Sequence, residues 1–139
     1  MGESTGQSQV LLRNALWCNA LFSILSGIVI VIYNQRLAAF LGLPGEVNLI
    51  ALAIGLVGYA VMLSINARRP SIKITDAWVA VIMDSIWVLG SYVLLFVVPF
   101  SAGGKWLIVL LAEVVFAFAV LQIFGIRRVT KGQVPAQAR

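Results

Sequence analysis

The stretch LIVLLAEVVFAFAVLQIF, residues 107–124, decides the fold class of this chain. It is almost entirely apolar, and a helix needs about 20 such residues to cross the hydrocarbon core of a bilayer, which is about 30 Å thick. A single carboxylic acid, Glu113, lies near its middle. An ionisable group at that depth costs free energy, so it requires a partner or a function. The stretch therefore predicts a transmembrane helix with a polar group in its interior.

Three further apolar runs repeat this pattern along the chain. Of its 139 residues, 61% are hydrophobic and 11% are charged, whereas soluble domains have about 25% charged residues. A water-soluble four-helix bundle would carry polar residues on half of each helix, but these runs are apolar nearly all round. The sequence predicts one all-α integral membrane domain, a four-transmembrane-helix bundle, with a disordered tail over about residues 130–139. The expected spans are about residues 10–33, 49–65, 77–99 and 106–126.

Lysine and arginine are distributed unevenly between the two sides of the predicted bundle. Eight of the ten lie at the start of the first span, between the second and third spans, or after the fourth, and only Arg36 and Lys105 lie on the other side. Because positive residues are retained in the cytoplasm, both termini are predicted to be cytoplasmic. The basic stretch RRVTKGQVPAQAR, residues 127–139, is interpreted as a topology anchor in preference to a nucleic-acid or lipid-headgroup site. We expect no nucleic-acid partner.

The chain has no histidine and a single cysteine, Cys18. The commonest ligands of haem and zinc are therefore missing, and neither an intrachain disulfide nor a Cys-x-x-Cys pair can form. Only aspartate and glutamate are left to hold a hard cation. We expect no cofactor, no metal site and no enzymatic activity.

The first loop on the less basic side differs from the other loops. Residues 34–46, NQRLAAFLGLPGE, place Leu37, Phe40 and Leu41 on one side of a possible short helix that ends at Gly42 and Pro44. An amphipathic segment of this size lies in the headgroup region of a membrane. The alternative is a loop that packs on the bundle.

Each predicted span brings a polar group close to the middle of the membrane. With a rise of about 1.5 Å per residue, Asn19 and Asp84 lie about 12–13 Å from the basic end, and Tyr59 and Glu113 fall at a similar middle height. We predict that these four groups face one another. At least one of the two carboxyl groups is then expected to be protonated at neutral pH and to donate a hydrogen bond to Asn19 or Tyr59.

Small and polar residues share helix faces with these groups. Ser23 follows Asn19 at one turn, and Trp87 lies beside the face of Asp84. Such faces allow helices to approach closely and to form interhelical hydrogen bonds. Gln122 lies on the opposite face of its helix from Glu113, so it is assigned to a different contact.

Two functions fit this pattern. In the first, the buried polar centre fastens a helix bundle or a subunit assembly, and the protein is an accessory or structural membrane subunit. In the second, it is a proton-linked transporter or a binder of a small apolar or cationic ligand, acting as a homo-oligomer because four helices barely enclose a pathway. The partners are then the lipid bilayer, further copies or a larger membrane complex, and the ligand. The candidate ligand- or proton-binding residues are Asp84, Glu113, Asn19, Tyr59, Trp87 and Ser23.

A family resemblance covers about residues 10–45. The segments LLRNALWCNALFSILSGIVIV, residues 11–31, and LAAFLGLP, residues 37–44, resemble the start of small bacterial four-helix membrane proteins, including the DoxX-like group with its similar layout. The resemblance implies a compact bundle in the bacterial inner membrane. Asp84 and Glu113 lie outside the matching segments, so it implies no role for either.

Overall fold

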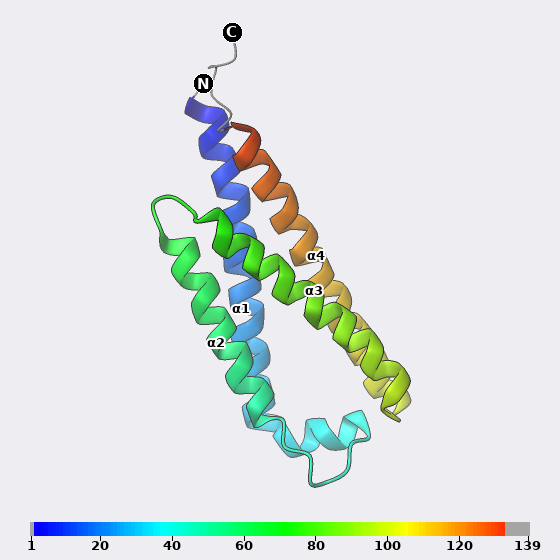
Figure 1. The fold of residues 1–139 in the computed structure, drawn as a ribbon. Helices are drawn as coiled ribbons and strands as arrows, with labels where there is room; N and C mark the ends of the chain where they lie inside the picture. The colour runs from blue at the N-terminus through cyan, green and yellow to red at the C-terminus, as the bar shows by residue number, and fades with distance from the viewer. Residues whose placement is uncertain (1, 133–139) are drawn as a thin grey trace.

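Residues 2–132 are described by a computed structural model, and within that range every long element is an α-helix (Figure 1). Four helices are long and apolar enough to cross a membrane, which confirms the predicted all-α, four-helix architecture of a multi-pass membrane protein. The described part of the predicted tail, residues 130–132, continues the fourth helix, and residues 133–139 lie outside the described residues. The helices are α1 Gly2–Leu41, α2 Ile50–Arg68, α3 Ile74–Val97 and α4 Ala102–Gly132.

Helix α1 bends at Tyr33, where the backbone leaves helical geometry with φ −111° and ψ 21°. The predicted end of the first span falls at the same residue. Beyond it, residues 34–41 form a short helical piece that runs across the end of the bundle (Figure 1). The possible short helix in this loop is therefore present, and it also packs on the bundle.

The short helical piece is attached to the start of α4. The Ser101 N–H donates to the carbonyl of Leu41 at 2.9 Å, and the Ser101 hydroxyl donates to the carbonyl of Phe40. The same hydroxyl accepts the N–H of Gly104 at 2.9 Å, which caps α4. Gly42 follows the piece with φ +77°, a backbone conformation that L side chains rarely adopt. Hydrogen bonds from Ser101 therefore hold the short helical piece against the start of α4.

Helix α1 lies between α2 and α4, and α3 packs along α4. Helices α2 and α3 diverge from the turn that joins them (Figure 1). Close approach of α1 and α4 depends on Gly125, because a Cβ added there would lie 2.9 Å from the Cβ of Leu12. The interior is built mainly from small residues, which let helix backbones come together in a membrane. These buried residues include Ala15, Ala20, Ala53, Ala60, Ala67, Ala77, Ala80, Ala112 and Ala119.

Seven of the nine lysine and arginine residues that the structure describes lie toward one end of the bundle, where α1 begins, α2 joins α3 and α4 ends (Figure 1). The turn between α2 and α3 is held there by Asn66, whose side chain accepts from the Lys73 N–H at 2.9 Å and donates to the Lys73 carbonyl at 3.2 Å. Arg13 donates to the carbonyl of Arg69 at 3.0 Å and to that of Pro70 at 3.2 Å. Arg13, one of the residues on the predicted basic side, therefore fastens the α2–α3 turn to α1.

Candidate functional site

One polar side chain from each helix meets inside the bundle, around the carboxylate of Asp84. We call Asn19, Tyr59, Asp84 and Gln122 the Asp84 centre. Oδ2 of Asp84 accepts the Asn19 amide at 2.8 Å and the Gln122 amide at 2.9 Å, and Oδ1 accepts the Tyr59 hydroxyl at 2.7 Å. Asn19, Asp84 and Gln122 are all at most 2% exposed. A single carboxyl group of α3 is thus bonded to all three other helices.

The helix faces around the Asp84 centre explain why these side chains can meet. Ala80 lies one turn before Asp84 and Ala60 lies beside Tyr59, and both are fully buried. Their small side chains leave room for the polar groups to reach across between helices. The centre therefore occupies the same interior as the apolar core, and each of its members comes from a different helix.

The donors and acceptors of the centre fit an ionised Asp84. A carboxylate only accepts hydrogen bonds, and this one receives two amide N–H groups and one hydroxyl. The protonated acid that the sequence led us to expect would fit the same heavy-atom positions, because the Tyr59 hydroxyl can accept from Asp84 as well as donate to it.

Two groups of the centre have more hydrogen-bonding positions than they can fill at one time: the Tyr59 hydroxyl and the Gln122 side-chain oxygen. The Tyr59 hydroxyl also lies 3.1 Å from the carbonyl of Ala80, so its single proton has two acceptors in reach. The Oε1 atom of Gln122 is buried and accepts no hydrogen bond from any residue that the structure describes. The centre can therefore rearrange its protons while the helices stay in place.

Glu113 lies outside the Asp84 centre. It is exposed on the outer surface of the bundle, where its Oε1 accepts the hydroxyl of Tyr92. Glu113 precedes Gln122 by nine residues of α4, about 13 Å of helix. The Tyr92–Glu113 pair and the Asp84–Gln122 pair, each formed between α3 and α4, therefore lie at different heights in the bundle. The expectation that Glu113 faces Asp84 is wrong, and so is the assignment of Gln122 to a different contact.

The error has a physical cause in the geometry of α4. Nine helical residues turn through a net angle of about 180°, so Glu113 and Gln122 lie on opposite faces and only one of them can point inward. The inward face is the one that carries Ala112, Val115, Ala119, Gln122 and Ile126, all buried. Their spacing of three and four residues is the signal by which Gln122 could have been found. Glu113 was predicted to be the inward residue because its side chain is ionisable.

The two remaining candidate residues, Ser23 and Trp87, each lie about one helical turn along the chain from a member of the Asp84 centre. Ser23 is buried one helical turn beyond Asn19. Trp87 is half-buried on α3, and its backbone carbonyl accepts the hydroxyl of Ser91 at 2.8 Å. Among residues 2–132, no group of three side chains of the types that commonly bind metals lies close enough together to hold an ion.

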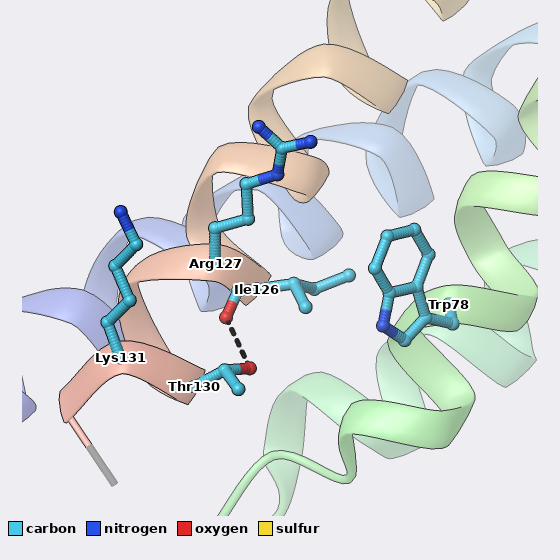
Figure 2. Close-up of a pocket in the computed structure, with 5 residues that line it drawn as sticks. All are labelled: Trp78, Ile126, Arg127, Thr130 and Lys131. Carbon is cyan, nitrogen blue, oxygen red and sulfur yellow. Dashed lines mark hydrogen bonds between the residues drawn. The ribbon is translucent and has the colours of Figure 1, made fainter. Parts of the chain in front are cut away.

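Apart from the Asp84 centre, a concave feature lies at the basic end of the bundle, between α3 and α4. It is an open recess of about 440 Å³. Figure 2 shows Trp78 of α3 on one side and three α4 side chains, Arg127, Thr130 and Lys131, on the other. The hydroxyl of Thr130 donates to the carbonyl of Ile126 at 2.9 Å, within α4. The sequence indicated this end as a topology anchor, but it did not predict a recess.

Comparison of the sequence with protein-family models, with curated proteins and with solved structures gave no significant match.

Proposed function

We propose that this chain is a structural or accessory membrane subunit, and that its Asp84 centre fastens its own four helices into one unit. The observation that carries the proposal is that Asp84 accepts hydrogen bonds from the three other helices of the same chain. Interhelical hydrogen bonds in membranes contribute about 0.6 kcal/mol each on average and up to about 1.7. Three on one carboxylate would contribute about 2 kcal/mol, in addition to the close packing of a core that consists largely of small side chains. We expect no enzymatic step.

We further propose that the protein resides in the bacterial inner membrane with both termini in the cytoplasm. The basic residues support this orientation, because seven of the nine that the structure describes lie toward the end where α1 begins and α4 ends. Assembly with further copies or in a larger membrane complex is also part of the proposal. Its supporting observation is the Tyr92–Glu113 pair, which lies on the outer surface of the bundle, where a carboxyl group is costly unless a partner covers it.

The substitution Tyr59→Phe tests the fastening role, since it removes only the hydroxyl that bonds Asp84. We expect the free energy of unfolding to fall by about 1 kcal/mol, as one interhelical hydrogen bond is lost. The measurement is reversible unfolding in mixed detergent micelles, followed by tryptophan fluorescence. The matched control is Tyr33→Phe, at an exposed tyrosine of α1. A Tyr59→Phe variant as stable as the control would contradict the fastening role.

A second function, proton-linked binding at Asp84, is favoured by the two acceptors of the Tyr59 hydroxyl. With Asp84 ionised, Tyr59 donates to Oδ1 of Asp84. With a proton on Oδ1, Asp84 donates to the Tyr59 oxygen, and Tyr59 donates to the carbonyl of Ala80. Both states use the same heavy-atom positions, so the centre can take up and release a proton without opening the bundle.

Infrared difference spectroscopy across a pH titration tests this second function. Lower pH favours the protonated acid, so we expect the carbonyl stretching band of a carboxylic acid to grow as the pH falls. The part of the band that belongs to Asp84 should be missing from Asp84→Asn and retained in Glu113→Gln, which controls for the other intramembrane acid. An unchanged band in Asp84→Asn would show that Asp84 binds no proton in the range titrated, and the second function would then be abandoned.

A further inference from the structure

We propose that the recess between α3 and α4 binds the phosphate of an anionic phospholipid headgroup. The recess is lined by Trp78, Ile126, Arg127, Thr130 and Lys131 (Figure 2). Its volume of about 440 Å³ falls within the roughly 300–1,000 Å³ of small-molecule sites. This site is separate from the Asp84 centre, and the proposal goes beyond the fastening function because it assigns a ligand to the protein.

The two basic side chains of the recess suit a phosphate group. Arg127 and Lys131 are four residues apart in α4, so they lie on one helix face about 6 Å from each other. A guanidinium group binds phosphate oxygens through two parallel hydrogen bonds, and an ammonium group adds a compact charge. Within residues 2–132, salt bridges form only between Asp76 and the side chains of Arg69 and Lys73. Both basic groups of the recess are therefore available to an anion.

Trp78 completes the recess on the side of α3. It is 41% exposed near the start of its helix, at the depth where tryptophan is enriched in membrane proteins. Figure 2 shows the nitrogen-bearing edge of its ring turned toward α4. The indole N–H can donate to a phosphate or glycerol oxygen in the recess.

The surface beside the recess favours a lipid over a soluble phosphate compound. Ile82 and Ile86 follow Trp78 at four-residue intervals on α3, and they are 54% and 59% exposed. They extend the face of Trp78 deeper into the membrane, where the acyl chains of a bound lipid would contact them. Basic pockets between transmembrane helices are a known setting for anionic headgroups, and the cytoplasmic leaflet is rich in such lipids. A soluble anion would gain nothing from the apolar wall.

Lipid titration of the purified protein, read by native mass spectrometry, tests the proposal. The probes are phosphatidylglycerol and phosphatidylcholine, added separately to the protein in a neutral detergent. We expect phosphatidylglycerol to bind at least tenfold more tightly. Replacing both basic residues, Arg127→Gln with Lys131→Gln, should weaken its binding by tenfold or more, because each basic group in contact with the anionic headgroup is expected to contribute about a fivefold factor.

The matched control is Arg128→Gln, which removes a positive charge from an exposed neighbour that does not line the recess. We expect it to change phosphatidylglycerol binding by less than threefold, while Arg127→Gln alone weakens it about fivefold. Equal effects of these two single variants, or equal binding of the two lipids, would overturn the proposal. Displacement of phosphatidylglycerol by millimolar inorganic phosphate would also overturn it, because the site would then take a soluble anion. Unfolding temperatures of all variants verify that they are folded.

Discussion

Asp84→Leu is expected to lower the free energy of unfolding by about 3 kcal/mol. Three donors lose their acceptor, from Asn19, Tyr59 and Gln122. Asn19 and Gln122 would remain inside the bundle without that acceptor, at a cost of about 1 kcal/mol or more each, while the Tyr59 hydroxyl keeps the carbonyl of Ala80 and loses one hydrogen bond. Leucine is close to aspartate in length and suits the apolar interior, so the loss reports on the hydrogen bonds. Reversible unfolding in mixed micelles measures it.

Glu113→Leu makes the same chemical change on the outer surface of the bundle, and it is the control for Asp84→Leu. Its carboxyl group has one partner, the hydroxyl of Tyr92. We expect a change of less than about 1 kcal/mol, the range of one interhelical hydrogen bond. The mass of this variant in nanodiscs also reports whether the Tyr92–Glu113 face takes part in assembly. Equal destabilisation by the two substitutions would mean that the Asp84 centre has no special role.

Gly125→Ala is expected to destabilise the bundle by about 2 kcal/mol. The added Cβ would lie 2.9 Å from the Cβ and 3.0 Å from the Cα of Leu12. Because the Cα belongs to the backbone, α1 and α4 must move apart, and overpacking of this kind costs about 1–3 kcal/mol. Gln122 is one turn away on the same helix, so the movement also strains its bond to Asp84. Unfolding in mixed micelles is again the measurement.

Gly90→Ala is the matched control, because a Cβ added to Gly90 meets nothing within 4 Å. In that open position alanine should leave stability unchanged or raise it by up to about 1 kcal/mol, since it favours the helix more than glycine does. If Gly125→Ala were as stable as Gly90→Ala, the close contact between α1 and α4 would not be a feature of the folded protein.

The architecture could be predicted from the sequence because apolar length alone requires transmembrane helices. Helix rise then placed Asn19, Tyr59 and Asp84 at a common depth, and the structure brings all three together. The bend at Tyr33 coincides with the predicted end of the first span. Helix rise also placed Glu113 at this depth, and that prediction is wrong, because Glu113 lies about 13 Å along α4 from Gln122, which bonds Asp84.

The fourth member of the centre could not be predicted in the same way. Which face of α4 points inward depends on its packing against α1 and α3, and both faces carry a polar residue. Because its carboxyl group is ionisable, Glu113 was the predicted inward residue of α4. The residue that is buried is Gln122, whose side chain is a neutral amide. One carboxylate with three neutral donors is easier to bury than two acids side by side, because like charges repel strongly where the dielectric constant is low. That balance favours Gln122 over Glu113 on the inward face of α4.

The recess at the basic end also lay beyond the sequence. Arg127 and Lys131 belong to the basic stretch after the fourth predicted span, and Trp78 lies at the start of the third. Their meeting depends on the placement of α3 against α4, since the residues are about fifty positions apart in the chain. A site formed between helices requires the packing to be known, even when each helix is predicted correctly.

The most direct measurement is a double-mutant cycle between Tyr59→Phe and Asp84→Leu, with unfolding free energies of both single variants and of the combination. If the two side chains bond inside one bundle, the combined loss is smaller than the sum of the single losses by about 1 kcal/mol, because the shared hydrogen bond is lost only once. Strict additivity of the two losses would contradict an Asp84 carboxylate that ties the helices together through its neighbours.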